Sequence, residues 1–197
     1  MKSAMGSDVT EKLEKILTTN GNIRKILERA PELRMPNCYL AAGCISQTVW
    51  NTLHGFSSDF GIKDYDLVYY DPSDISYEGE DSYIREGKRL FADVPAVIEI
   101  KNQARVHLWF EQKFGFKIPP YQSVEDAISS WSTTATCVGV RRINNKFEVF
   151  APYGLDSVFE MTVKPVQSLF TQKMYENKVN RWMNLWPKLK VMPWAGQ

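Results

Sequence analysis

The chain has 197 residues, of which 44% are hydrophobic and 24% charged, and its 24 Lys and Arg residues oppose 23 Asp and Glu for a net charge of +1. This length predicts one domain, or one domain with an appended lobe. Aromatic residues make up 13% of the chain, which excludes the composition of a disordered protein. A near-neutral charge also excludes general attachment to nucleic acid or anionic membranes. A specific function must therefore reside in a defined site.

The cysteine and hydropathy patterns narrow the class of protein further. Cys38, Cys44 and Cys137 are odd in number and widely spaced, which favours neither a disulfide framework nor a zinc site. No apolar run approaches the roughly 20 residues that span a bilayer, and the first residues lack the apolar stretch of a signal peptide. We therefore expect a cytoplasmic protein without membrane association.

Apolar periodicity and turn residues predict helices that alternate with strands, followed by a hairpin. The expected helices cover residues 8–19, 23–30, 45–54, 84–91, 103–114, 123–131, 154–160 and 167–186. The expected strands cover residues 38–42, 65–70, 96–100, 134–142 and 147–150. This order is typical of an α/β or α+β domain, with a mixed sheet flanked by helices, a C-terminal hairpin and a long helix. We expect N-terminal helices in 1–34, a core in 35–120 and an extension in 121–197 that packs on the same globule.

Two carboxylates flank Tyr65 at the entry of an apolar strand. Because side chains alternate along a strand, Asp64 and Asp66 face the same side about 6.6 Å apart, which lets both approach metal ions. The pattern itself is common, since 23 acidic residues among 197 give roughly 2.7 acid-x-acid pairs by chance, and Glu78 and Glu80 form another. The apolar neighbours are more informative, because an unpaired carboxylate in such surroundings is costly unless a cation meets it.

Two further features join this pair of carboxylates. Glu99 is an isolated acid between Ile98 and Ile100 on the next expected strand. Gly43 lies at a turn from strand to helix, where free backbone N–H groups and the helix dipole favour a phosphate. A strand, a glycine turn, a helix, an Asp-x-Asp strand and an acid-bearing strand together indicate phosphoryl transfer.

Seven short stretches of the chain match a known family. They are Ala42–Ile45, Val49–Trp50, Asp64–Asp71, Lys101–Trp109, Ser123–Ile128, Thr133–Thr136 and Ala151–Asp156. Their order resembles the polymerase-β-type nucleotidyltransferase superfamily, which includes the CCA-adding enzymes. The similarity is greatest to a bacterial branch of nucleotidyltransferase-like proteins of undefined substrate, and it spans roughly residues 35 to 186.

The resemblance implies a nucleotidyltransferase-type fold and a reaction. A nucleoside monophosphate would move from a nucleoside triphosphate to a hydroxyl acceptor, which is a small molecule, a protein or RNA. Asp64, Asp66 and Glu99 would bind two Mg²⁺ (or Mn²⁺) ions, and Glu99 would help to deprotonate the acceptor. Mg²⁺ suits carboxylates combined with phosphate oxygens and waters, and positioning and charge neutralisation would carry the rate. The near-zero net charge argues against a long RNA acceptor.

Four more residues are candidates for binding the nucleotide. Gly43 and Cys44 would act at the turn, and Lys101 and Arg105 would bind phosphate after the third acid. Members of the superfamily usually carry Ser or Gly where Cys44 stands, and a thiol is a weak donor, so backbone N–H groups would do the binding there. The alternative for Arg105 is that it forms an ion pair with a carboxylate. His107 lies near these residues, and the structural alternative for it is a histidine whose hydrogen bonds are satisfied within the fold.

Three functions remain open at this point. The first is the metal-dependent enzyme, which requires that Glu99 face Asp64 and Asp66 with no lysine or arginine neutralising them. The second is a catalytically silent nucleotide-binding or regulatory module with the same fold, favoured by Cys44 and by the lack of a visible nucleobase pocket. The third is a partner-binding protein that uses the aromatic residues of the long C-terminal helix.

Overall fold

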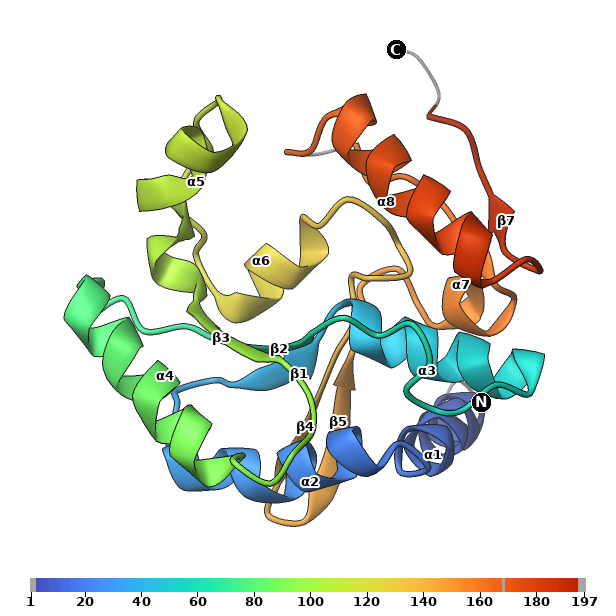
Figure 1. Cartoon of the computed structure of the whole chain (residues 1–197), viewed down its shortest axis with the longest axis horizontal. Coiled ribbons are helices and arrows are strands. Elements are labelled where there is room, and N and C mark those ends of the chain that lie inside the picture. Colours follow the sequence, from blue (N-terminus) through green and yellow to red (C-terminus); the bar gives the residue numbers. More distant parts are fainter. Residues whose placement is uncertain (1–2, 168, 195–197) are drawn as a thin grey trace.

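The computed structural model describes residues 3–167 and 169–194 (Figure 1). The helices are α1 (Ser3–Leu17), α2 (Gly21–Arg29), α3 (Gly43–His54), α4 (Tyr77–Leu90), α5 (Val106–Phe114), α6 (Val124–Ser129), α7 (Asp156–Phe159) and α8 (Gln172–Leu185), with 3-10 turns η1 (Ala30–Leu33) and η2 (Gln103–Arg105). The strands are β1 (Tyr39–Ala41), β2 (Tyr65–Tyr69), β3 (Ile98–Asn102), β4 (Gly139–Ile143), β5 (Lys146–Phe150), β6 (Thr162–Val163) and β7 (Lys190–Val191). The remaining positions of the expected segments, 1–2, 168 and 195–197, lie outside the described residues.

Within the described residues, five strands form one mixed sheet in the order β3-β2-β1-β4-β5. β1 is antiparallel to β2 and β4, whereas β2 and β3 are parallel. The β4–β5 hairpin turns through Asn144 and Asn145, whose φ angles of 50° and 64° are the left-handed pair that a two-residue hairpin loop needs. The predicted mixed sheet with its C-terminal hairpin and long helix is confirmed. The two-stranded β6–β7 sheet was not predicted, because each strand has only two residues.

Alternation along the strands divides the sheet into two faces. Leu40 and Leu67 belong to the large core formed with α1, α2 and α3. Tyr39 and Val68 point to the opposite face, where they pack against α6. In Figure 1, α1, α2 and α4 lie below the sheet, while α5, α6 and α8 lie above it. Asp66 shares the face of Val68 and is therefore directed toward the side of α5, α6 and α8.

Tryptophans hold the long C-terminal helix in place. Trp50 of α3 is buried, and its ring meets Trp182 and Trp186 edge-on, with centroids 5.2 and 5.5 Å away. The Nε1–H of Trp186 donates to Asn51 Oδ1 at 2.6 Å. These rings are core, so they do not form an exposed docking stripe. None of the helices in the described part of the chain is long and apolar enough to cross a membrane.

Two element boundaries differ from the prediction for identifiable reasons. α4 begins at Tyr77, seven residues earlier than expected, because Ser76 caps it by accepting the Gly79 N–H at 3.0 Å. Glu78 and Glu80 then occupy its first turn, where negative charge is favoured. β4 begins only at Gly139, because the preceding 133–137 segment folds into hydrogen-bonded turns.

A buried polar network fastens α4 to the end of β3. Glu80 accepts a hydrogen bond from the Asn102 N–H at 2.8 Å and forms an ion pair with the Arg105 guanidinium. The side chains of Glu80 and Arg105 are each 11% exposed. Asn102 also accepts the Asp71 N–H at 3.0 Å and donates to the Asp71 carbonyl at 2.9 Å. The network thus joins the chain that follows β2 to the chain that follows β3.

We expect Arg105→Met to lower the free energy of unfolding by about 3 kcal/mol, because it leaves the buried Glu80 carboxylate without its cation. Urea denaturation measures this change. The control is Arg85→Met on α4, whose arginine is 65% exposed in its ion pair with Asp81; here the change should stay within about 0.5 kcal/mol. Equal losses in the two variants would show that the Glu80–Arg105 pair is not a fastening of the fold.

Candidate active site

Two of the three predicted carboxylates meet across neighbouring strands. The parallel register places Asp66 opposite Glu99, and adjacent strands lie only about 4.8 Å apart. The two side chains are 23% and 39% exposed, so both reach solvent. Asp64 lies just before β2 and is half-buried. The structure therefore brings Asp66 and Glu99 together, as the sequence predicts, with Asp64 at the strand entry.

Lys101 lies between these two carboxylates. Its Nζ is 3.7 Å from Asp66 Oδ1 and forms an ion pair with Glu99 Oε2. This contradicts the expectation that no lysine neutralises the acids. Lys101 lies beside them because side chains alternate along a strand, and the residue two positions after Glu99 is on the same face. Burial lowers the pKa of Lys101, but the charges of Asp66 and Glu99 outweigh burial and leave that pKa raised. The ammonium is therefore held in its charged form.

The carboxylates suit a hard divalent cation without forming a closed cage. Across residues 3–167 and 169–194, no group of three His, Cys, Asp or Glu side chains is placed to hold one metal ion. Mg²⁺ commonly takes one or two carboxylates from a protein, with phosphate oxygens and waters completing its shell. Asp66 and Glu99 supply that number of accessible donors. The donor set fits a cation that arrives with a nucleotide, and Lys101 has to leave the same oxygens for it to bind.

The pKa of Asp66 is strongly displaced. Burial raises it from an ordinary 3.8 to about 6, the charge of Lys101 opposes the rise, and repulsion from Asp64 and Glu99 adds to it. The positive charge of Lys178 also opposes the rise. A carboxyl with a displaced pKa in a cleft is typical of a functional site, because a fold without such a task would avoid the cost.

The predicted glycine turn forms beside Asp66 and is strained. Ala42 connects β1 to α3 with φ 67° and ψ −138°, a conformation almost confined to glycine. Its N–H donates to the Val138 carbonyl at 3.0 Å, which helps to hold it there. A Cβ at Gly43 would lie 2.6 Å from Nε2 of the buried Gln47, so the end of that side chain would have to shift to accept a larger residue. No side chain caps this helix end, and Ala42 lines the same cleft as Asp66.

Two predicted nucleotide-binding side chains lie away from the cleft. Cys44 is buried in the main core, where its thiol donates to the Ala41 carbonyl at 3.3 Å. Burial raises the pKa of this thiol well above its ordinary value, so the thiol stays protonated in the core. Arg105 is held by Glu80 and does not line the cleft. We therefore correct the phosphate-binding prediction for Arg105 to a structural role.

Asp66 opens into a cleft of about 200 Å³, whose lining residues include side chains of α5 and α8. Glu99 and Asp64 are not among the described residues that line it. In Figure 1, α5 and α8 lie on the same side of the sheet. Ala42, Asp66 and Lys101 lie on the strand side of this cleft. The α5 wall is aromatic and carries one cation, and α8 supplies another. These wall residues are Trp109, Phe110, Lys113 and Phe114 from α5, and Lys178 from α8. The cleft therefore combines a carboxylate, cations and flat apolar rings.

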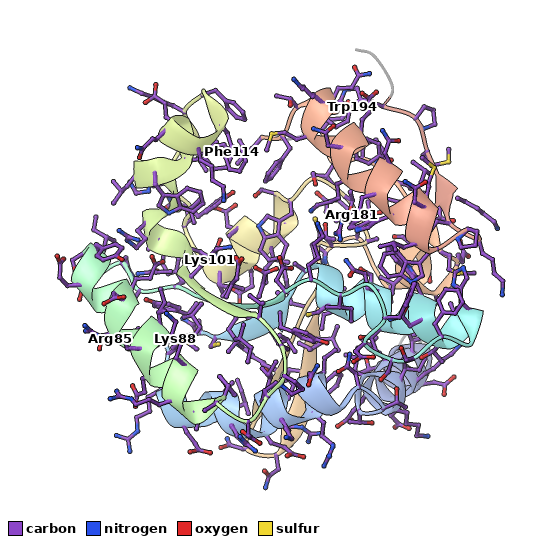
Figure 2. All side chains as sticks on the ribbon, viewed as in Figure 1. Arg85, Lys88, Lys101, Phe114, Arg181 and Trp194 are labelled. Carbon is purple, nitrogen blue, oxygen red and sulfur yellow. The ribbon has the colours of Figure 1, made fainter. Side chains whose placement is uncertain are left out.

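The sequence did not single out Lys178 or its neighbour Arg181. Burial lowers the pKa of Lys178, Asp66 opposes this change, and the positive charge of Arg181 adds to it. Figure 2 shows Arg181 on the inner side of α8. Their spacing of three residues on one helix was visible in the sequence, but a pair of surface cations on a solvated helix has the same spacing. Only the docking of α8 distinguishes the two cases.

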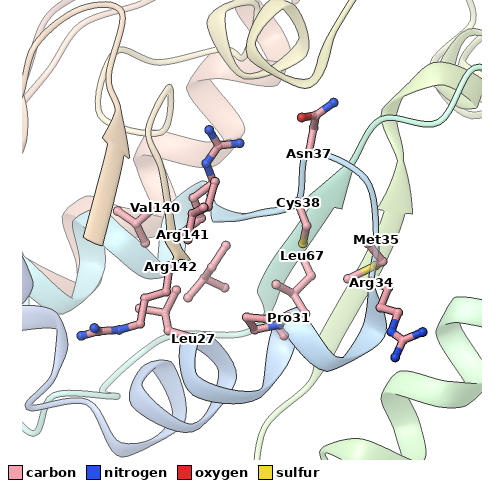
Figure 3. A pocket seen from close by; sticks show the side chains of 13 residues that line it. Leu27, Pro31, Arg34, Met35, Asn37, Cys38, Leu67, Val140, Arg141 and Arg142 are labelled. Carbon is pink, nitrogen blue, oxygen red and sulfur yellow. The ribbon is translucent and has the colours of Figure 1, made fainter. Parts of the chain in front are cut away.

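A second cavity of about 180 Å³ lies on the opposite face of the sheet, between η1 and β4 (Figure 3). Met35, Cys38 and Leu67 line it, and Arg34 and Arg142 extend from it in Figure 3. Burial raises the pKa of Cys38 to about 12, so this thiol stays protonated. No carboxylate is among the described residues that line this cavity. It therefore offers neither metal ligands nor a nucleophile, and the cleft above Asp66 is the candidate active site.

Comparison with known proteins agrees with this geometry. A solved structure, described as an NMR structure that reveals a CCA-adding enzyme head domain, matches with a TM-score of 0.72 and 26% identity over 92% of this chain and 96% of that one. The fold is thus that of a nucleotidyltransferase head domain. The model of a nucleotidyltransferase family matches residues 28–191, and the chain belongs to this family. No curated protein matches the chain.

We expect Ala42→Gly to raise the free energy of unfolding by about 1 kcal/mol, because glycine adopts the backbone angles of residue 42 without the steric cost of a Cβ. Urea denaturation provides the measurement. Ala41→Gly in the adjacent strand is the control, and it should lower stability by about 0.5–1 kcal/mol, since strand glycine is entropically unfavourable. A loss of stability in Ala42→Gly as large as in the control would show that residue 42 is unstrained.

We expect Asp66→Asn to stabilise the protein at pH 8 and to have little effect at pH 4. The folded state binds the Asp66 proton more tightly than the unfolded chain, with pKa values of about 6 and 3.8. The stability from the neutral carboxyl is therefore present below pH 4 and lost as the pH rises through 6. Removing the charge should recover on the order of 2 kcal/mol at pH 8. Urea denaturation at both pH values tests this, and a gain independent of pH would contradict it.

Proposed function

We propose that this protein transfers a nucleoside monophosphate from a nucleoside triphosphate to a hydroxyl acceptor in the cleft above Asp66 and Glu99. The supporting observation is that Asp66 lines a cleft whose walls carry cations and aromatic rings and lies opposite Glu99 on the adjacent strand, in a chain of the nucleotidyltransferase family. The net charge of +1 favours a small molecule or a protein over a long RNA as acceptor.

Asp66 and Glu99, with Asp64 beside them, would hold Mg²⁺ or Mn²⁺. When bound, the ion neutralises phosphate charge and polarises the α-phosphate. Lys101, which shares the face of these acids, then donates to a phosphate oxygen instead of to the carboxylates. The acceptor oxygen bonds to the α-phosphorus while the bond to the bridging oxygen breaks, and pyrophosphate leaves. Glu99 receives the proton of the acceptor hydroxyl.

The turn and the aromatic wall position the rest of the nucleotide. The N-terminus of α3 has no side-chain cap, so the backbone N–H groups that follow Ala42 are suited to phosphate oxygens. Trp109 and Phe114 offer flat surfaces on which a base can stack, a contact that tolerates different bases. This wall meets the need for a nucleobase surface that the sequence alone did not reveal.

One observation favours a second candidate, a nucleotide-binding module without turnover. Lys101 already neutralises Asp66 and Glu99, so the free chain does not meet the condition stated for the enzyme from the sequence, which was that no lysine or arginine neutralise the acids. The enzyme requires Lys101 to leave these oxygens when a metal ion binds. Calorimetry with each nucleoside triphosphate and Mn²⁺, beside an assay of pyrophosphate release over a range of acceptors, separates the two functions. Binding with no release in any acceptor mixture supports the module, and release supports the enzyme.

We expect the double variant Asp64→Asn and Asp66→Asn to lower transfer of label from [α-³²P]NTP by at least about a hundredfold, because it removes the charges that would hold the metal ion. Circular dichroism and denaturation should show a folded chain. Asp59→Asn, which makes the same kind of substitution at one exposed position outside the cleft, is the control and should keep native activity. Undiminished transfer by the folded double variant would refute the assignment.

A further inference from the structure

Two cations lie about one helical turn apart on α8, and the first of them lines the candidate active site. Lys178 lines the cleft together with Asp66 and Lys101. Arg181 follows three residues later, so its side chain leaves the same side of the helix. Both residues are only partly exposed, and Figure 2 shows Arg181 directed toward the interior of the molecule. The helix therefore presents Lys178 to the cleft of Asp66, and Arg181 is a second cation close enough to act on the charge of Lys178.

Neither cation has an anionic partner. In the described part of the chain, no carboxylate oxygen lies within ion-pair distance of Lys178 or Arg181. The Nη1 of Arg181 is buried and has no hydrogen-bond partner. The Nζ of Lys178 lies 5.6 Å from the centroid of the Trp182 ring. By contrast, each of four other partly exposed arginines holds a carboxylate: Arg29, Arg105, Arg141 and Arg142.

An unpaired pair of half-buried cations is costly. Burying a charge without a partner loses hydration, and placing two like charges side by side adds repulsion. A guanidinium beside an ammonium matches an anion with several oxygens spread over two centres, since the guanidinium binds two oxygens in a plane and the ammonium binds as a point charge. A diphosphate group has this form.

We propose that Lys178 and Arg181 bind the β- and γ-phosphates of the nucleoside triphosphate, the group that leaves as pyrophosphate. This inference rests on the proposed function and adds the residues that would hold the leaving group. It places the α-phosphate at Asp66 and Glu99 and the rest of the polyphosphate toward α8. The C-terminal helix is then part of the substrate site, although it begins 70 residues after the end of β3.

Pyrophosphate binding without metal tests the proposal, since the readout does not depend on turnover. Calorimetry in the presence of EDTA should show that Lys178→Met and Arg181→Met each weaken pyrophosphate binding by about tenfold or more, because each removes a charged donor. Lys173→Met, at an exposed position of α8, is the matched control and should change affinity less than twofold. Arg181→Lys, which keeps the charge without the planar fork, should fall between. Unchanged affinity in both methionine variants would overturn the proposal.

A competition experiment tests whether the bound phosphates are those of a nucleoside triphosphate. A non-hydrolysable nucleoside triphosphate should compete with pyrophosphate, and inorganic phosphate should bind more weakly because it engages one centre. Simultaneous binding of the analogue and pyrophosphate would overturn the assignment to the leaving group.

The outcomes also separate this inference from the proposed function. If pyrophosphate binds through Lys178 and Arg181 but no acceptor receives a nucleotide, the enzymatic proposal fails and the anion site stands. If transfer occurs and the KM for the nucleotide is the same in Lys178→Met and Arg181→Met as in the native chain, the anion site fails and the enzyme stands. Asp66→Asn should keep or strengthen pyrophosphate binding, since it removes a negative charge near Lys178.

Discussion

The parallel pairing of β2 with β3 is the constraint on which the candidate site depends. Its register sets Asp66 opposite Glu99 and Val68 opposite Lys101, so two acids and a lysine share one small area of the sheet. A shift by one residue would turn Glu99 and Lys101 to the other face, because side chains alternate along a strand. Core packing and a polar network together fix this register. Ile100 and Leu67 lie in the main core, and the Glu80–Asn102–Arg105 network holds the end of β3.

Several features of the site reduce stability, and the surrounding structure maintains them. Asp66 carries a raised pKa because burial and two neighbouring acids disfavour its charge. Ala42 adopts a backbone conformation suited to glycine, and Lys178 and Arg181 lie together without a carboxylate. Ala42, Asp66 and Lys178 line one cleft, while the polar groups of the Asn102 network are paired. This distribution is typical of a protein in which a ligand completes the charge balance.

The position of Lys101 distinguishes the two functions that we consider, the metal-dependent enzyme and the nucleotide-binding module without turnover. With no ligand, its ammonium balances the negative charge of Asp66 and Glu99. A metal ion that arrives with a nucleotide competes for the same oxygens, and the phosphates offer the ammonium another partner. The same residue therefore keeps the free site neutral and is available to the substrate. Catalysis would require this exchange, whereas a silent module would keep the lysine in place.

The sequence by itself determined the mixed sheet, the hairpin at Asn144 and Asn145, the turn at Gly43 and the acids on two strands. Each of these features depends on residues that are close together in the sequence, since apolar alternation predicts a strand and turn residues predict a bend over a few positions. Only the tertiary structure decided which charged groups meet. Arg105 pairs with Glu80 because α4 packs on β3, and Cys44 points into the core. Lys178 reaches the cleft, with Arg181 near it, because Trp50 holds α8. Pairing between charges that are distant in the sequence depends on which helices and strands pack together, and the spacing of residues along the chain does not predict that packing.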